Sequence, residues 1–452
     1  MRYKFNIEKY VKRSLLMLVV GVSHLAYADP ASDALPQGGV VTQGNASIES
    51  AGSPSAPVLN INQTSQRAVV DWHSFDVGSA STVNFNQPNA QASTLNRVTG
   101  GGSASQIFGK INAPGEVILV NPSGVYIGKN ASLDVGSIAA TSHHISDKDY
   151  MDGKATYDRN GATGSVTNDG SIRARFGGYV ALLAPEVRNN GLIIAQQGTV
   201  VMASGEKITL NFDPNTRLAS IAADPSQINS LVENKQAVEV PGGLIIMSAR
   251  VANSLIRGVI NQAGSLSTSD TAQLVAKGGR IVIEGSHTTL QTGSETVARG
   301  SSSGGSVEIA GTHEVNIQSG AKVSVSATQS GHGGVITTHS LGKTTLNGTL
   351  LAQGGKISGN GGVINTGSTL LEIGSSASVK AGNRGTGEVG AWHIHATSLD
   401  INHNNDKVLS AALDKANINM KLVRNYCASY GGCDFNMTPG LIFDPGAMIS
   451  KT

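Results

Sequence analysis

A turn between apolar segments constrains the fold of this chain most. Residues 117–120 are apolar, residues 121–124 read Asn-Pro-Ser-Gly, a second apolar segment covers residues 125–127, and a third β-type segment covers 131–138. Proline presets the backbone for a turn and glycine accepts a positive φ, so the sequence predicts a sharp corner between short β-strands. Short strands joined by tight corners along a long chain are typical of a β-solenoid.

Weak internal repeats extend this pattern along the chain. The segment Asn168–Ile172 recurs 21 residues later as Asn189–Ile193, and apolar and polar residues alternate in segments such as Lys322–Ser326. A Gly-Gly-x-Val/Ile signature recurs at intervals of 26, 29 and 28 residues, starting at Gly278, Gly304, Gly333 and Gly361. A rung of three short strands with corners needs roughly 20 residues or more. These intervals therefore predict one rung per repeat and an all-β solenoid.

The composition favours a long thin core over a compact aromatic one. Only 14% of the residues are charged and 4% are aromatic, whereas 56 are glycine. The formal net charge is +2, with no basic run beyond the first 13 residues, so the sequence shows no sign of nucleic-acid binding. Helical periodicity is rare, and its best segments are the short Pro225–Glu233 and Ala249–Arg257.

The N-terminal segment has the features of an export signal. A basic region over residues 2–13 precedes an apolar stretch over 14–25, and Ala26-Tyr27-Ala28 matches the small-x-small cleavage pattern. This predicts a signal peptide over residues 1–28, cleaved between Ala28 and Asp29. The alternative is an uncleaved membrane anchor, but the apolar stretch is short for a membrane span.

Each end of a solenoid exposes strand edges and needs a cap. The segment Leu35–Phe85 is irregular in sequence, and we expect it to cover the first rung. The segment Ile401–Val423 is richer in asparagine and contains the helix-like Leu409–Leu413, so we expect it to end the solenoid.

The two cysteines of the chain, Cys427 and Cys433, are separated by five residues that include Gly-Gly. In an oxidising compartment two such thiols are expected to pair. A zinc site is the alternative, but the spacing is wide and no histidine or further cysteine follows. Because the loop is small, the bridge would stabilise the whole fold only slightly.

No residue pattern for catalysis stands out. The glycine-rich Thr99–Ser103 lacks the lysine and helix start of a phosphate-binding loop. Two histidine pairs would place imidazoles near one another without a third metal ligand, so surface or satisfied histidines are the favoured interpretation; they are His143-His144 and His393 with His395. Three aspartates lie beside β-segments without a partner for general acid catalysis; they are Asp71, Asp76 and Asp134. We therefore predict no cofactor and no metal site.

Four ordered blocks of sequence resemble one known family. They cover residues 66–78, 95–100, 107–111 and 117–136. Together they resemble the secretion domain of two-partner secretion exoproteins, the haemagglutination-activity domain of filamentous-haemagglutinin-like adhesins. The Trp-His-Ser-Phe segment at residues 72–75 is similar to that of the high-molecular-weight adhesins and the haem–haemopexin utilisation exoproteins. The similarity continues less specifically through residues 181–191 and 198–206 to Trp392.

This resemblance implies a right-handed, single-stranded parallel β-helix with an N-terminal cap. It also implies export through Sec and the periplasm, where the periplasmic repeats of a dedicated outer-membrane transporter recognise the N-terminal domain. The family's Asn-Pro-Asn-Gly-Ile turn maps, with Ser and Val replacing the second Asn and the Ile, onto Asn121, Pro122, Ser123, Gly124 and Val125. Because Ser also supports a turn, we expect the same geometry.

The resemblance offers further site residues. The additional candidates for transporter recognition are Trp72, Asn96 and Arg97. In relatives a C-terminal cysteine pair forms a disulfide that stalls export and tethers the exoprotein to its transporter, and this role maps onto Cys427 and Cys433.

These observations predict four regions: a signal peptide over 1–28, a secretion domain over 29–285, further β-helix over 286–400, and a C-terminal cap with the cysteine anchor over 401–452. We expect a secreted or surface-tethered bacterial exoprotein that acts as an adhesin toward a host-cell, matrix or polysaccharide receptor. The alternatives are a binder of haem proteins for iron acquisition and a secreted β-helix polysaccharide lyase or hydrolase. The length of 452 residues is short for the family and leaves open a compact exoprotein or the remnant of a longer one.

Overall fold

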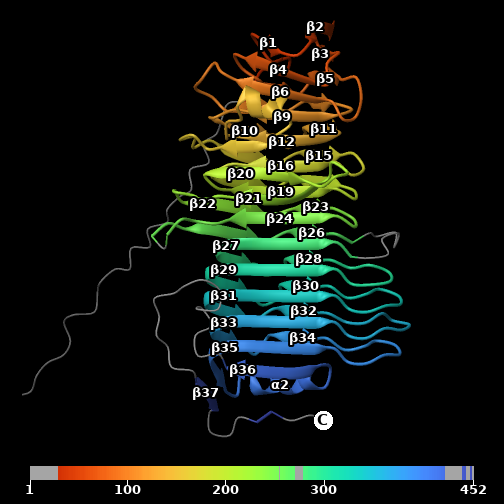
Figure 1. Ribbon diagram of the computed structural model, residues 1–452, viewed down its shortest axis with the longest axis vertical. Coiled ribbons are helices and arrows are strands. Elements are labelled where there is room, and N and C mark those ends of the chain that lie inside the picture. The colour runs from red at the N-terminus through yellow and green to blue at the C-terminus, as the bar shows by residue number, and fades with distance from the viewer. Residues whose placement is uncertain (1–28, 254, 270–277, 423–439, 444–447, 450–452) are drawn as a thin grey trace, which may run out of the picture.

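The computed structural model describes residues 29–253, 255–269, 278–422, 440–443 and 448–449. In these residues the chain winds into a right-handed parallel β-helix, whose rungs stack along the long axis from the N-terminal to the C-terminal end (Figure 1). The predicted all-β solenoid is therefore confirmed.

Each early rung contributes three strands. In one rung β9 (Glu116–Val120), β10 (Gly124–Ile127) and β11 (Ser132–Val135) follow one another, and each pairs in parallel with its counterparts in the neighbouring rungs. In later rungs one long strand takes the place of the first two. The first half of β27 (Arg280–Leu290) pairs with β24 (Leu244–Ala249) and the second half pairs with β25 (Gly258–Gln262).

The first two strand positions together form one sheet, which has 21 strands within the described residues. Its other strands are β1 (Val40–Gln43), β4 (Arg67–Trp72), β6 (Ser93–Val98), β7 (Ser105–Ile107), β12 (Ser137–Thr141), β14 (Ser165–Asn168), β16 (Tyr179–Leu183), β17 (Glu186–Asn189), β19 (Thr199–Ser204), β22 (Ser230–Asn234), β29 (Ser306–Ile317), β31 (Val335–Leu346), β33 (Val363–Ile373), β35 (Ala391–Ile401), β36 (Asn417–Leu422) and β37 (Gly440–Phe443).

The third strand position forms a separate sheet, with 13 strands in the same described residues. Besides β11 it contains β2 (Ala46–Ser53), β3 (Ala56–Gln63), β5 (Thr82–Asn86), β8 (Lys110–Asn112), β15 (Ser171–Ala174), β18 (Leu192–Ala195), β23 (Ala237–Glu239), β26 (Ser265–Ser267), β28 (Glu295–Val297), β30 (Lys322–Ser324), β32 (Thr349–Leu351) and β34 (Ser378–Lys380).

The core consists of apolar side chains that stack one per rung. Val117 pairs with Ile138, Ile138 with Val180, and Val180 with Val200, and all four are buried. The same register position continues, two residues after each Gly-Gly of the later repeats, through Ile281, Val307, Ile336 and Ile364. Because β-branched side chains pack well on a pleated surface, this stack explains the recurring Val/Ile of the sequence signature.

The asparagine-containing repeats form a buried ladder at one corner. Asn168 Nδ2 donates to Asn189 Oδ1 at 2.7 Å, Asn189 Nδ2 donates to Asn234 Oδ1 at 2.8 Å, and Asn234 Nδ2 donates to Gln262 Oε1 at 3.0 Å. All four side chains are 0% exposed. A side-chain amide can both donate and accept, so each buried amide of the ladder forms a hydrogen bond with the amide in the next rung.

The segment Leu35–Phe85 provides the expected N-terminal cap, and it does so with strands, which its irregular sequence did not indicate. β1 pairs antiparallel with β4, and β2 and β3 form an antiparallel hairpin whose second strand continues in parallel to β5. Antiparallel strands at the end of a parallel stack cover backbone groups that the first rung would otherwise expose.

Two insertions build an outer layer on the 21-stranded sheet. Residues 142–164 contain α1 (Asp147–Met151) and β13 (Thr156–Asp158), and residues 205–229 contain β20 (Lys207–Phe212) and β21 (Leu218–Ala223). β13, β20 and β21 form an antiparallel sheet, whose apolar side chains share a second core with the outward residues of the rungs beneath. All five residues of β16 are therefore buried, whereas β29 shows alternating burial.

The helix predictions are partly wrong. Part of Pro225–Glu233 belongs to β22, which pairs with both β17 and β25. Ala249 ends β24, and the described residues after it, 250–253 and 255–257, form a loop in which Val251 bridges to Ser226. Pairing on both sides of a strand outweighs a weak local pattern. The helix-like Leu409–Leu413 does lie in a helix, α2 (Asp406–Leu413), beneath the last rungs.

Candidate functional site

The Asn-Pro-Ser-Gly turn forms the corner between β9 and β10. The Asn121 side chain joins two chain segments: its Oδ1 accepts from Ser123 N at 2.9 Å, and its Nδ2 donates to Ser103 O at 3.0 Å and to Ser105 Oγ at 3.1 Å. Gly124 N donates to Asn121 O at 2.8 Å and closes the turn. Asn121 is 3% exposed, so these bonds satisfy a buried amide.

Glycine allows this corner to pack against the next rung. Gly124 has a φ of +110°, and a Cβ atom there would lie 2.5 Å from Ser165 O. Val125 is buried in β10, whereas Pro122 is exposed and Ser123 is half-buried. The turn therefore presents Pro122 and Ser123 at the surface while its other residues hold the corner in place.

Two of the other predicted recognition residues meet inside the core. Trp72 Nε1 donates to Asn96 Oδ1 at 3.0 Å, and both side chains are buried. Phe75 packs edge-on against Trp72, with ring centroids 5.4 Å apart. In the folded chain Trp72 and Asn96 therefore stabilise the first rungs and do not face solvent.

Arg97 lies on the outward face beside the turn. It pairs with Asp71 at 2.8 Å and with Asp147 of α1 at 2.6 Å. Its strand neighbour on β9 is Val120, which immediately precedes Asn121. Burial acts to lower the pKa of Arg97, but the two carboxylates outweigh it and the pKa is raised, so Arg97 stays charged. The structure thus brings Arg97 next to the turn and joins α1 to the rungs there.

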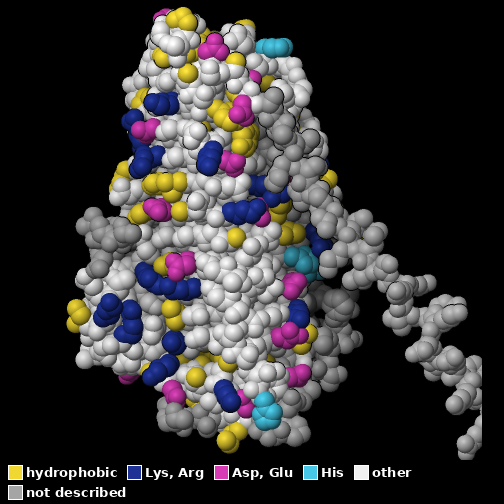
Figure 2. Space-filling view, turned by 180° about the vertical axis from the view of Figure 1, so that it is seen from behind, with side chains coloured by type: hydrophobic (Ala, Val, Ile, Leu, Met, Phe, Trp, Pro, Cys, Tyr) yellow, Lys and Arg dark blue, Asp and Glu magenta, His cyan; other side chains and the backbone are white. Residues whose placement is uncertain are grey.

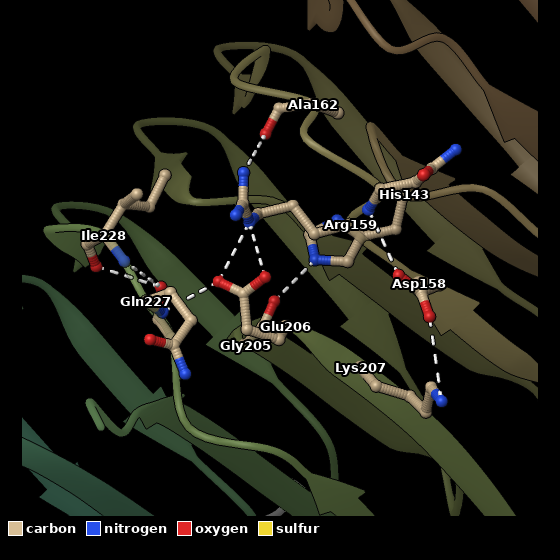
Figure 3. A network of polar contacts seen from close by, with 11 residues as sticks. His143, Asp158, Arg159, Ala162, Gly205, Glu206, Lys207, Gln227 and Ile228 are labelled. Carbon is tan, nitrogen blue, oxygen red and sulfur yellow. Dashed lines mark hydrogen bonds and ion pairs between the residues drawn. The ribbon is translucent and has the colours of Figure 1, made fainter.

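A polar network fastens the two insertions to each other (Figure 3). Arg159 Nε donates to both carboxylate oxygens of Glu206 at 2.9 Å, and Gln227 N donates to Glu206 Oε1 at 2.7 Å. His143 Nε2 lies 2.8 Å from Gly205 O, so in the neutral ring this nitrogen carries the hydrogen and donates it. Burial raises the pKa of Glu206, but these hydrogen bonds outweigh it and the pKa is lowered. Burial lowers the pKa of His143.

The remaining histidines and aspartates of the sequence analysis do not form a catalytic or metal centre in the described residues. His143 is buried and bonded to the backbone, as the favoured interpretation expected, and His393 and His395 share the outward face of β35 with ring centroids 6.5 Å apart. Asp76 Oδ1 accepts from the backbone of Gln106, and Asp134 is exposed. No group of three or more His, Cys, Asp or Glu side chains among the described residues is arranged to hold a metal ion.

A groove that the sequence analysis missed lies between the outer layer and the rungs. It has a volume of about 440 Å³. Its floor contains Arg67, Glu116, Ser137 and Tyr179, which start neighbouring strands of the 21-stranded sheet. Its walls contain residues that follow α1, the turn between β20 and β21, and the corners before β6, β9, β12 and β16. No local sequence signal marks these residues, because they come together only when both insertions fold back.

Three of the predicted site residues lie outside the described residues. These are Ala28 of the cleavage site and the anchor cysteines Cys427 and Cys433. Asp29, the other cleavage residue, is the first residue that the structure describes.

The fold defines the chain as a parallel β-helix protein. Figure 2 shows a face on which small polar side chains and backbone predominate, with charged side chains scattered over it. Residues 32–289, more than half of the chain, match the TPS secretion domain family, and the chain belongs to this family of two-partner secretion exoproteins. Such exoproteins pass through the periplasm and an outer-membrane transporter, and are secreted or exposed at the cell surface. The described residues contain no helix that is long and apolar enough to cross a membrane.

Comparison with known proteins gives relatives that match part of the chain. A heme/hemopexin-binding protein of Haemophilus influenzae strain Rd is 31% identical over 262 residues, which cover 56% of this chain and 27% of that relative. A second heme/hemopexin-binding protein of Haemophilus influenzae is 38% identical over 143 residues, 32% of this chain and 14% of that relative. The chain therefore matches only a minor part of either relative.

A solved structure shows the same fold. The crystal structure of the HMW1 secretion domain from Haemophilus influenzae superimposes with a TM-score of 0.61 at 22% sequence identity, and the match covers 79% of this chain and all of that one.

Proposed function

We propose that the exported chain is a non-enzymatic adhesin, and that the rungs after the secretion domain carry its binding surface. The observation that carries this proposal is a stack of four loops at one side of these rungs (Figure 1). The loops connect the short strands β28, β30, β32 and β34 to the long strands that follow, over residues 298–305, 325–334, 352–362 and 381–390. They lie beyond residue 289, where the match to the secretion family ends.

Backbone hydrogen bonds order these loops. Gly331 N donates to Ser358 O and Gly359 N donates to Thr386 O, both at 2.8 Å. A stack held by its backbone leaves side chains free to vary, which suits a recognition surface on a rigid scaffold. Exposed apolar side chains lie on this region: Ile357 is 67% exposed, Val335 41% and Val389 37%. A partner protein that covers these side chains would remove their apolar surface from water, which favours association.

A second candidate function is binding of a haem-carrying host protein. Two relatives that match part of the chain are heme/hemopexin-binding proteins, which supports this alternative. The match covers 27% and 14% of their lengths, so their ligand comes to this chain as a proposal.

One binding experiment distinguishes the two candidates. Purified mature chain is tested by surface plasmon resonance against immobilised hemopexin and, in parallel, by attachment to epithelial cells and matrix proteins. The double variant Lys356→Ser, Ile357→Ser changes one loop, and Leu255→Ser, at a residue 93% exposed outside the loop stack, is the matched control. An adhesin that uses the loops loses attachment in the double variant only. A chain that binds neither cells, matrix nor hemopexin contradicts both candidates.

We also propose that the Asn121–Gly124 turn is read by the transporter. Support comes from its position inside the secretion domain. It also comes from the exposed Pro122 and the half-buried Ser123, which lie on a corner held by buried hydrogen bonds. The paired Arg97 beside it would extend this surface, whereas the buried Trp72 and Asn96 would contribute by keeping the first rungs folded.

A further inference from the structure

We propose that the groove between the outer layer and the rungs binds an acidic oligosaccharide, of the class that carries uronic acid units. Its volume of about 440 Å³ lies within the range of small-molecule sites. The groove belongs to the secretion domain and is separate from the loop stack, so this inference stands independently of the adhesin proposal.

The floor of the groove is one polar register column. Arg67 pairs with Ser93, Ser93 with Glu116, and Glu116 with Ser137, so these residues lie side by side on successive strands. Ser93 is buried and bonded to the Tyr150 hydroxyl, so only Arg67, Glu116 and Ser137 of this row line the groove. Tyr179 begins β16, whose next residue, Val180, pairs with Ile138. A hydroxyl- and carboxylate-bearing floor in an otherwise apolar outer core offers fixed hydrogen-bonding positions to a ligand.

The groove holds more positive charge than the protein itself neutralises. Four basic side chains line it, against the single carboxylate of Glu116; they are Arg67, Lys154, Arg175 and Arg217. Lys154 pairs with Asp149 at 3.2 Å, but none of the three arginines forms an ion pair within the described residues. Guanidinium groups bind carboxylates through two parallel hydrogen bonds, so the unpaired arginines call for an anionic ligand.

The arginines approach the groove from different elements. Arg67 lies over the Tyr150 ring, 5.1 Å from its centroid. Arg217 belongs to the outer layer and reaches the facing corner, where a Cβ atom on Gly177 would lie 3.9 Å from its Nε. Arg175 is exposed on that same corner. An anion placed between them would therefore contact both the rungs and the outer layer.

Aromatic rings and a carboxylate select a sugar among anionic ligands. The ring of Tyr179, in the floor of the groove, lies 5.6 Å from the ring of Phe212 between their centroids, and Phe176 is 68% exposed at the rim. Such rings offer apolar faces against which a sugar ring packs. The Tyr179 hydroxyl donates to Glu116 Oε1, which fixes the carboxylate as an acceptor for sugar hydroxyls. An acidic sugar carries both hydroxyls, which Glu116 can bind, and a carboxylate, which the arginines can bind. An inorganic anion has no such hydroxyls on a ring.

Isothermal titration calorimetry with the mature chain tests this proposal. The probes are a hyaluronan tetrasaccharide, which represents host glycans, and an alginate tetrasaccharide, which represents bacterial polysaccharide. Chitotetraose is the neutral control and tetraglutamate is the acidic control without a sugar. We expect at least one uronate probe to bind, and the stronger of the two identifies the source. Binding by neither of them, or equal binding of either control, overturns the proposal.

Surface variants locate the site without disturbing the fold. The double variant Arg175→Ser, Arg217→Ser removes two exposed groove arginines, and we expect affinity to fall by about tenfold or more for each charged hydrogen-bonding group lost. Arg173→Ser, also exposed but on β15 outside the groove, is the matched control and should leave affinity unchanged. If Arg173→Ser lowers the affinity as much as the double variant does, the ligand is held by unspecific charge attraction, and the assignment of the site to the groove is overturned. Far-UV circular dichroism checks that all variants remain folded.

Discussion

The indole nitrogen of Trp72 donates a 3.0 Å hydrogen bond to Asn96 Oδ1 inside the first rungs of the β-helix. Both residues are buried, and Asn96 Nδ2 in turn donates to the backbone oxygens of Thr94 and Ile118 at 3.3 Å. A buried polar group without a hydrogen-bond partner lowers the stability of the fold. The strands that carry Trp72 and Asn96 must therefore stay in register to keep this hydrogen bond.

Replacing Asn96 by Ala should therefore destabilise the fold. It leaves the Trp72 N–H without its acceptor in the core, and we expect a loss of about 1–3 kcal/mol in the free energy of unfolding. Urea denaturation followed by circular dichroism measures this. Asn86→Ala changes an exposed asparagine on β5 and should shift stability by less than about 0.5 kcal/mol. Equal stability of the two variants would contradict the role of the buried pair.

Changing the corner turn should block export. Asn121→Ala removes the bonds to Ser103, Ser105 and Ser123, and Gly124→Ala meets both a φ of +110° and Ser165 O. In a strain that carries the partner transporter, immunoblots should then find the chain in the periplasm and little in the medium. Asn130→Ala, at an exposed position in the next corner, between β10 and β11, should be exported normally. Undiminished secretion of Asn121→Ala would refute the proposed role of the turn.

The outer layer should loosen in mild acid because of His143. Burial lowers the pKa of this histidine below its usual 6.5, and the nearby Arg159 lowers it further. The hydrogen bond to Gly205 O and the carboxylates of Glu206 and Asp158 act in the opposite direction but do not outweigh burial. Below pH 6.5 the unfolded chain then binds more protons than the folded one, so stability falls as the pH falls from 6.5 toward the lower folded pKa. The lowered pKa of Glu206 adds its own loss only below its usual 4.5.

Thermal melts between pH 7.5 and 5 test this assignment, in a range set by the usual histidine pKa of about 6.5. His143→Gln keeps an amide donor for Gly205 O but does not titrate, so its melting temperature should fall less with acid than that of the wild type. His403→Gln, at a residue whose side chain is 67% exposed, serves as the control and should behave like the wild type. Parallel pH profiles for the wild type and His143→Gln would show that His143 is not responsible.

The C-terminal cysteine pair should tether the exoprotein without stabilising it. Changing both Cys427 and Cys433 to Ser should leave the melting temperature nearly unchanged, because so small a loop restricts the unfolded chain only slightly. The same change should move the protein from the cell surface into the culture medium, as cell fractionation would show. If the double variant stays on the cells in wild-type amounts, the pair has no role in anchoring.

Much of this fold could be predicted from local sequence. The Gly-Gly-x-Val/Ile intervals and the repeated asparagines mark positions that recur once per rung, and the Asn-Pro-Ser-Gly turn marks a single corner between two strands. In a solenoid each rung contacts mainly its neighbours, so a residue such as Ile336 needs only the same position one repeat away, in Val307 and Ile364, to be buried. The interval between sequence repeats therefore corresponds to one rung of the β-helix.

The outer layer and its groove were decided by tertiary structure alone. Tyr150, Tyr179 and Arg217 come from α1, the rungs and the second insertion, and no repeat relates them. The sequence did contain one trace of this layer: strands such as Tyr179–Leu183 are apolar throughout, as strands buried on both faces are. The sequence did not indicate which segments cover these strands, because the covering layer forms only when residues 142–164 and 205–229 pair through β13 and β20. Contacts between segments about 50 residues apart without a shared period leave no pattern in a single sequence.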